Sequence, residues 1–256
     1  MKSRVYIQNL KKYPEIFQKL VTRYFLRIDM RPILLLHGAL GSKNQLDPLK
    51  TALEESGHKV YALNFSGHGG KPFRDPFGIE GFAEDVLHFQ KENGLRITEV
   101  FGYSMGGYVA LWHAHRHPDS VGKIVTLGTK FDWSPGAAER EVKKVNPDKI
   151  EEKIPAFARV LQDRHAPNDW KELLHKTAQM MTQLGARPSL TIEILKNIPH
   201  QVSILLGDLD DTADLTFSQS VAEALPYGKF SLLEKTPHPL ERVDVKLLEK
   251  RILDIF

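Results

Sequence analysis

The chain carries, in order, three kinds of side chain that together perform nucleophilic catalysis. The first is Ser104, at the centre of Gly102-Tyr103-Ser104-Met105-Gly106, a G-x-S-x-G segment between an apolar strand and a helix start rich in small residues. This pattern predicts a nucleophile elbow, a strained strand-to-helix turn that exposes the serine hydroxyl beside the amides of a helix N-terminus. Because a serine hydroxyl is a weak nucleophile at neutral pH, it needs a base within hydrogen-bond reach.

The other two kinds of side chain follow later strands. His238 is the best candidate for the base, because it lies in the loop after the last predicted strand. An acid must orient the imidazole and stabilise its charged form. Its candidates gather near the end of the preceding strand, with one alternative after an earlier strand: Asp208, Asp210, Asp211 and Asp214, and then Asp132.

Three closely spaced histidines could suggest a metal site. They are His113, His115 and His117, on a predicted helix. Only the first and the third share a face of that helix, and no carboxylate lies in the same turn, so we expect solvent-exposed side chains and no metal. The chain has no cysteine, which excludes a disulfide framework, a cysteine nucleophile and thiolate metal ligands.

Alternating strands and helices are expected to position the candidate residues. We predict strands over 33–36, 59–65, 97–101, 121–127 and 202–210, another from residue 230, and an edge strand over 21–30. Helices are predicted over 44–56, 79–92, 106–117 and 240–252. Strands separated by helices imply right-handed crossovers, so the fold class is α/β with a doubly wound, mostly parallel sheet.

Residues 131–199 interrupt this alternation. They contain no convincing strand, and helices are predicted over 147–163, 169–184 and 190–197. We therefore expect a core formed by residues 1–130 and 200–256, with a helical insertion over 131–199. Open α/β sheets bind ligands at the carboxyl ends of their strands, where such an insertion can cover the site. Its candidate ceiling residues are Phe131, Trp133, Trp170, Met180 and Met181.

Composition excludes several classes of function. The 256 residues are 41% hydrophobic and 26% charged, with a formal net charge of +3, and they show no basic stripe that would bind nucleic acid. No apolar run approaches the roughly 20 residues of a membrane span, and the first 20 residues lack the apolar stretch of a signal peptide. We expect a soluble, cytoplasmic monomer or small homo-oligomer that acts on a small-molecule substrate without a cofactor.

From about Arg31 to Phe256 the chain resembles the α/β-hydrolase superfamily. The resemblance rests on the G-x-S-x-G segment, on the His37-Gly38 turn after an apolar strand, and on the chain order Ser, Asp, His. It implies an α/β-hydrolase fold with a helical cap over 131–199 and a serine nucleophile.

The resemblance also implies the roles of individual residues. The family's G-x-x-D pattern falls on Gly207-Asp208-Leu209-Asp210, which favours Asp210 as the acid, with Asp211 as the neighbour that could replace it. The catalytic triad would then be Ser104, Asp210 and His238. Backbone amides would stabilise the oxyanion, and those of Met105 and Ala39 are expected to do so, with Leu40 as the near alternative to Ala39. His37 and His68 would be structural.

The resemblance implies hydrolysis of a carboxylic ester or thioester of a small-to-medium, largely apolar acyl group through an acyl-enzyme. Serine at position 104 excludes the haloalkane dehalogenase and epoxide hydrolase branches, which carry aspartate there. Other serine branches remain open: carbon–carbon bond hydrolases, the lyase of menaquinone synthesis, cofactor-free haloperoxidases and iminopeptidases. An alternative of a different class is a non-catalytic ligand receptor on the same fold.

Overall fold

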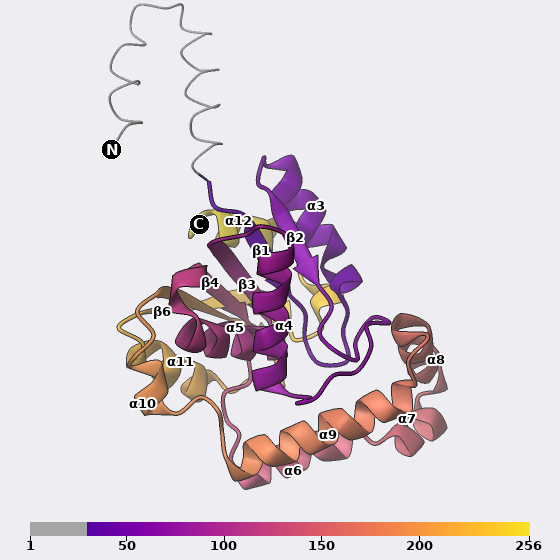
Figure 1. The fold of residues 1–256 in the computed structure, drawn as a ribbon. Helices are drawn as coiled ribbons and strands as arrows, with labels where there is room; N and C mark the ends of the chain where they lie inside the picture. Colours follow the sequence, from indigo (N-terminus) through magenta and orange to yellow (C-terminus); the bar gives the residue numbers. More distant parts are fainter. Residues whose placement is uncertain (1–29) are drawn as a thin grey trace, which may run out of the picture.

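A single parallel sheet forms the centre of the molecule. The computed structural model describes residues 30–256, and within this range the sheet has six strands in the order β2-β1-β3-β4-β5-β6 (Figure 1). The strands are β1 (Ile33–Leu36), β2 (Val60–Leu63), β3 (Thr98–Tyr103), β4 (Val121–Leu127), β5 (Gln201–Leu209) and β6 (Tyr227–Pro237). Because β2 and β3 flank β1 on opposite sides, the direction of winding reverses between β1 and β3. This confirms the doubly wound sheet and makes the carboxyl ends of β1 and β3 the expected ligand site.

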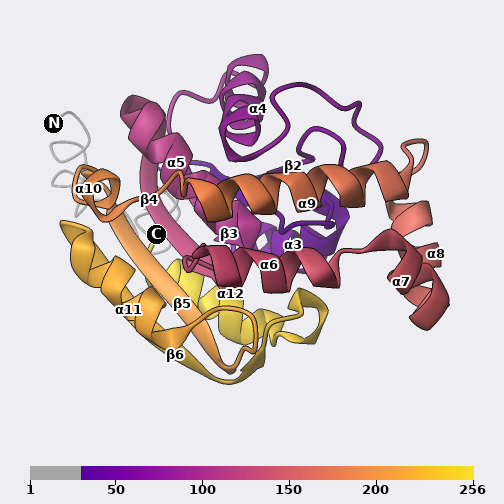
Figure 2. The ribbon, with the colours of Figure 1, turned by 90° about the horizontal axis from the view of Figure 1, so that it is seen from below.

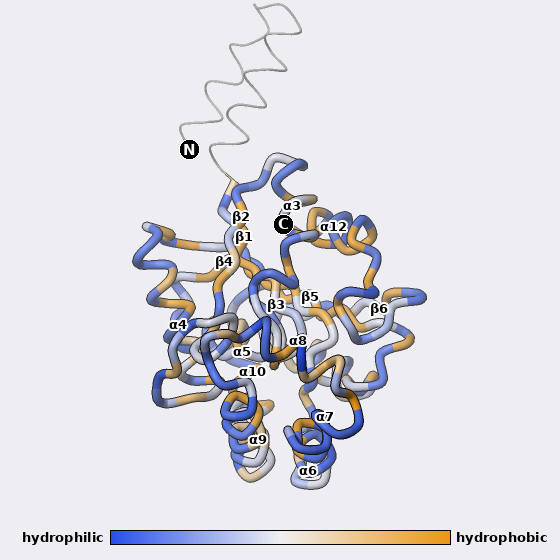
Figure 3. The backbone as a smooth tube through the Cα atoms, turned by 90° about the vertical axis from the view of Figure 1, so that its right-hand side faces the viewer, coloured by the Kyte–Doolittle hydropathy of each residue, from blue (hydrophilic) through white to orange (hydrophobic). Residues whose placement is uncertain are grey.

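Helices cover both faces of the sheet, and alternate side chains of β1 face them. Ile33 and Leu35 belong to the same buried cluster as side chains of α3 (Asp47–Glu55) and α12 (Val245–Leu253). Leu34 and Leu36 belong to the cluster on the other face, which includes side chains of α4 (Ile79–Glu92), α5 (Met105–Arg116) and α11 (Leu215–Ala224). Figure 3 shows α4 and α12 on opposite sides of the strands. The part of the chain that the structure describes also has three short 3₁₀ turns: η2 (Lys43–Leu46), η3 (Pro118–Ser120) and η4 (Leu240–Arg242).

Five helices connect β4 to β5. They are α6 (Pro135–Lys144), α7 (Pro147–Lys153), α8 (Pro155–His165), α9 (Trp170–Ala186) and α10 (Ile192–Leu195). Figures 1 and 2 show α6 and α9 side by side across one end of the core, with α7 and α8 at the far end of this pair. The two long helices approach closely at Gly185, where a Cβ atom would lie 2.5 Å from the Cβ of Ala138.

The structure corrects some of the predicted boundaries. The helix predicted over 147–163 is two helices, because Pro155 begins α8 and has no amide hydrogen to continue α7. Helix α6 was not predicted. The closing helix begins at Val245 rather than at residue 240, since the Asp244 side chain caps it. The edge strand predicted over 21–30 lies outside the described residues apart from Met30.

Candidate active site

Ser104 occupies a tight turn between β3 and α5. Its φ of 51° and ψ of −118° place a residue with a Cβ atom in a strained backbone conformation, which costs roughly 1–3 kcal/mol. Three hydrogen bonds hold this turn. The Ser104 amide donates to the carbonyl of Leu127 (2.8 Å), and the Ser104 carbonyl accepts from the amide of Gly107 (3.0 Å) and the hydroxyl of Thr129 (3.0 Å).

The two glycines of the G-x-S-x-G segment allow this turn by close backbone approach. A Cβ atom on Gly102 would lie 2.5 Å from the backbone of Gly106. A Cβ atom on Gly106 would collide with the backbone carbonyl of Leu36 in β1. The turn therefore has the geometry of a nucleophile elbow, as the sequence predicts.

His238 and Asp210 are brought together from the loops that follow β6 and β5. The distance from His238 Nδ1 to Asp210 Oδ2 is 2.8 Å, and the two side chains are 15% and 2% exposed. The other carboxylate oxygen accepts the amides of Thr212 (2.8 Å) and Ala213 (2.9 Å). Burial opposes the charged carboxylate, but the hydrogen bond from His238 and the two amides outweigh it and hold the pKa of Asp210 below its ordinary value.

This pairing fixes the tautomer of His238. An ionised carboxylate only accepts hydrogen bonds, so Nδ1 carries the proton and Nε2 of the neutral ring keeps a free lone pair. The backbone of His238 is held as well, because the hydroxyl of Tyr103 donates to its carbonyl (2.9 Å). Tyr103 directly precedes Ser104, so one strand end positions both Ser104 and His238.

None of the alternative acids, Asp132, Asp208, Asp211 and Asp214, forms a hydrogen bond or ion pair with His238. Asp132 accepts the amide of Ser134 (3.0 Å), and Asp211 is exposed and accepts the hydroxyl of Thr212 (3.3 Å). Of the candidate carboxylates, the geometry therefore favours Asp210.

Ser104 and His238 line one cavity of about 370 Å³. No hydrogen bond joins their side chains in the described structure, and catalytic hydrogen bonds are often long before substrate binds. Ala39, Leu40 and Met105 line the same cavity, and Met105 is the first residue of α5, where the amide has no partner within the helix. These are the positions that the sequence predicts for the oxyanion donors.

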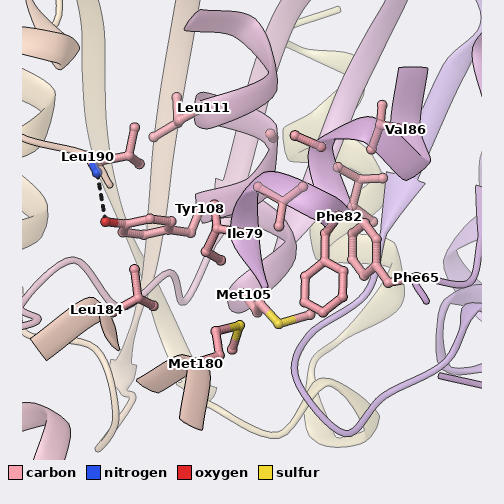
Figure 4. Close-up of a cluster of buried hydrophobic side chains, with 14 of the residues drawn as sticks. Phe65, Ile79, Phe82, Val86, Met105, Tyr108, Leu111, Met180, Leu184 and Leu190 are labelled. Carbon is pink, nitrogen blue, oxygen red and sulfur yellow. Dashed lines mark hydrogen bonds between the residues drawn. The ribbon is translucent and has the colours of Figure 1, made fainter. Parts of the chain in front are cut away.

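Most of the cavity wall is apolar, and one side is polar. The apolar residues are Ile79, Tyr108, Trp133, Val145, Phe157, Met180, Met181 and Leu184. Figure 4 shows Ile79, Tyr108, Met180 and Leu184 grouped around Met105, with the Tyr108 hydroxyl bonded to the amide of Leu190 (2.9 Å). The polar side consists of Lys130, Glu141, Lys144 and Thr212, in which Glu141 pairs with both lysines (3.7 and 3.1 Å).

Three of the five predicted ceiling residues line this cavity, namely Trp133, Met180 and Met181. The other two do not. Phe131 packs on the ring of Tyr108 at 6.4 Å, and Trp170 is buried in the core cluster shared with the inserted helices. The sequence did not single out Lys130 and Glu141, because charged residues there are also typical of a solvated surface.

The other histidines have structural environments. Burial lowers the pKa of His37 to about 3, so the ring is neutral; it accepts the amide of Phe65 (3.2 Å). The expectation of exposure was wrong for His113, which is fully buried, bonded to Gln90 and Ser120, and has its pKa lowered by burial to about 3. Among residues 30–256, no three histidine, aspartate or glutamate side chains are grouped to hold a metal ion.

Comparison with known proteins places this geometry in a family. A family model described as "alpha/beta hydrolase fold" matches residues 31–178, more than half of the chain. The chain is 31% identical over 147 residues to the sn-1-specific diacylglycerol lipase of Mus musculus, covering 55% of this chain and 47% of that protein. It is 36% identical over 92 residues to a pimeloyl-[acyl-carrier protein] methyl ester esterase of Neisseria meningitidis, covering 36% of this chain and 34% of the esterase. In each of these relatives, the match spans less than half of the relative's length.

A solved structure agrees over a longer range. The crystal structure of a putative lipase from Acinetobacter baumannii superposes with a TM-score of 0.72 at 16% identity, covering 88% of this chain and 83% of that one. Within the described residues, no helix has the length and apolar character needed to cross a membrane. From the family match and the shared fold, the chain belongs to the α/β-hydrolase fold family.

Proposed function

We propose that this chain is a serine hydrolase that cleaves a carboxylic ester or thioester of a small-to-medium, largely apolar acyl group. The observation that carries the proposal is the His238–Asp210 pair at 2.8 Å, whose histidine lines a mostly apolar cavity together with the strained Ser104. The cavity volume of about 370 Å³ lies within the range of small-molecule sites. The esterase and lipase names of the relatives agree with this reading.

In the proposed reaction, Nε2 of His238 takes the proton of the Ser104 hydroxyl while Oγ attacks the acyl carbon. The amides of Met105 and Ala39 stabilise the oxyanion, and Asp210 stabilises the imidazolium. Collapse of the intermediate breaks the bond to the alcohol or thiol, which leaves with the proton from His238. Water then attacks the acyl-enzyme by the same route and releases the carboxylic acid and free Ser104.

The two sides of the cavity suggest how a substrate lies. Thr212 gives its amide to Asp210, and its carbonyl lies 3.4 Å from the ammonium group of Lys130, so the polar side adjoins the triad acid. Because His238 protonates the leaving group, we place a polar alcohol or thiol on this side. The acyl group then occupies the apolar side, under residues 131–199 acting as a cap.

Covalent labelling tests this proposal. A fluorophosphonate probe should label the wild-type chain at Ser104, and Ser104→Ala should abolish labelling. Ser104→Ala and His238→Ala should each lower turnover of nitrophenyl esters or acyl-thioesters on the order of 10⁴-fold or more. A folded Ser104→Ala variant that keeps its activity would remove Ser104 from the mechanism. Ligand binding without labelling or turnover would favour a receptor instead.

A further inference from the structure

A second strained residue lies in the turn that follows β1. The amide of Gly41 donates to the carbonyl of Gly38 (3.1 Å), which closes a turn with Ala39 and Leu40 at its centre. Leu40 has a φ of 57°, in the left-handed region that a leucine rarely adopts. Such strain persists only where surrounding contacts enforce it. The turn also lines the Ser104 cavity, so its shape decides where the amides of Ala39 and Leu40 lie.

Two side chains at the end of α8 form hydrogen bonds with this turn. The guanidinium of Arg164 (Nη1) donates to the carbonyl of Leu40 at 2.9 Å, and His165 Nε2 lies 3.0 Å from the same oxygen. Nδ1 of His165 accepts the amide of Gly69 at 3.0 Å, so the single ring proton is on Nε2 and donates to Leu40. Both lone pairs of one carbonyl are therefore occupied by donors from the inserted helices.

The environment of these donors favours a fixed arrangement. His165 is fully buried, and burial lowers its pKa to about 4, so the ring stays neutral and keeps both hydrogen bonds near neutral pH. The Arg164 side chain is 18% exposed and also lies 3.7 Å from Glu241, in the 3₁₀ turn that follows His238. Arg164 thus connects the turn of Leu40 to the loop of His238.

A further contact anchors the same segment to the core. The side-chain amide of Asn168 donates to the carbonyls of Gly67 (3.2 Å) and Lys71 (2.7 Å), in the loop after β2. The end of α8 and the segment that follows it are therefore bonded to the loops after both β1 and β2. This explains how donors on an inserted helix stay fixed relative to the sheet.

We propose that Arg164 and His165 are positioning residues that hold the oxyanion turn of this active site in its strained, productive shape. The inference rests on the proposed function, because it assigns these residues to the stabilisation of an oxyanion at Ser104. Neither residue lines the Ser104 cavity, so both act through Leu40 and its neighbour Ala39. Their loss should weaken binding of the transition state and leave binding of the ground-state ester almost unchanged.

Kinetics of single variants test the proposal. Arg164→Met and His165→Leu should lower kcat by about 10- to 100-fold with little change in KM, a partial loss compared with the 10²–10³-fold effect of deleting an oxyanion donor. His165→Gln keeps a donor for the Leu40 carbonyl and Arg164→Lys keeps a charged donor, so each should recover part of kcat. The matched control is Arg159→Met, on an exposed residue of the same helix, which should behave as wild type.

The affinity for a boronic acid separates loss of oxyanion stabilisation from a general loss of packing. Its tetrahedral adduct with Ser104 places an oxygen where the oxyanion forms, so its affinity should fall in proportion to kcat/KM across the variants. Leu40→Gly gives a second comparison, because glycine adopts a positive φ without strain. Arg164→Met should therefore lower kcat by a smaller factor in the Leu40→Gly background than in the wild-type chain.

Three results would overturn the inference. The first is a folded Arg164→Met variant with wild-type kcat and wild-type affinity for the boronic acid. This result is decisive even if the His165→Leu variant does not fold. The second is a change confined to KM, since it would assign the residues to ground-state binding. In both cases, continued labelling of Ser104 would leave the proposed function intact. The third, a wild-type chain with neither labelling nor turnover, would overturn the proposed function and this inference together.

Discussion

Shortening Met180 to alanine should shift the preferred substrate toward longer acyl chains. Met180, Ile79 and Leu184 line the Ser104 cavity and also a second cavity of about 370 Å³, between the start of α4 and the end of α9. These three side chains therefore form the wall between the two spaces. Methionine is unbranched and flexible, which makes Met180 the most easily opened part of this wall.

The size of the effect follows from the atoms removed. Met180→Ala deletes three heavy atoms and leaves room for about three methylene groups of substrate. Each buried methylene contributes about 0.8 kcal/mol, so an ester three carbons longer than the wild-type optimum should gain about 2.4 kcal/mol. This corresponds to roughly 60-fold in kcat/KM relative to its rate in wild type. Because Met180 is buried, the substitution should also lower the free energy of unfolding by about 2–5 kcal/mol.

The assay is a series of nitrophenyl esters of graded chain length, with thermal unfolding as a check of the fold. Met180→Leu keeps most of the bulk and should retain the wild-type profile. Ala186 is exposed and lines only the second cavity, so Ala186→Trp in the Met180→Ala background should cancel the extension. An unchanged chain-length profile in a folded Met180→Ala variant would refute the reasoning.

Three further outcomes are expected. Asp210→Asn should lower kcat by roughly 10³- to 10⁴-fold, because an amide favours the wrong tautomer of the base; turnover at the wild-type level would remove Asp210 from the mechanism. Dialysis against a chelator should leave ester turnover unchanged, and a loss restored by a divalent cation would contradict a metal-independent reaction. Acid should destabilise the fold, because His37 and His113 have folded-state pKa values of about 3, below the 6.5 expected in the unfolded chain. Their stabilisation is complete above pH 6.5 and declines as the pH falls toward 3, by about 1.4 kcal/mol per pH unit for each histidine. Urea titrations at successive pH values measure this slope, which His37→Asn should reduce.

The sequence predicts the core of the fold because its signals are local. Strand β1 is apolar at every position, as a parallel strand covered on both faces must be. The turn at Ser104 can also be predicted from the sequence. Glycines are required on both sides of Ser104, because the backbone there contacts residues nearby in the chain and the adjacent strand. The order of the remaining candidates along the chain then indicates which strand ends carry His238 and Asp210.

The inserted helices were harder to predict because their packing depends on small or distant residues. Helix α6 buries only Ala137 and Ala138, and such small side chains do not by themselves indicate a helix that packs against a core. The partner surface includes Gly185 in α9, about 50 residues later, which no local pattern indicates. Trp170 and Met180 lie on the same helix, yet of these two only Met180 lines the cavity. The sequence could not separate them, because periodicity identifies the buried face of a helix and not the part of the protein that covers it.

The contacts of Arg164 and His165 could not have been read from the sequence for a related reason. Basic residues in the last turn of a helix are expected there in any case, because they complement the helix dipole. Only the tertiary arrangement shows that the acceptor is the Leu40 carbonyl, more than 120 residues earlier in the chain. The burial of His165 would have been a hint, but burial is not visible in the sequence.

Each group that the proposed reaction uses is held by a neighbour from a different part of the chain. The Ser104 backbone is bonded to Leu127 of β4, and the His238 backbone is bonded to Tyr103 of β3. These two supports belong to the sheet. The third, for the turn of Leu40, comes from α8. In the proposed reaction, the helices between β4 and β5 would therefore contribute both a wall for the acyl group and part of the framework that positions the oxyanion donors. Changes in substrate range at Met180 and changes in turnover at Arg164 should accordingly be separable, although both residues lie between β4 and β5.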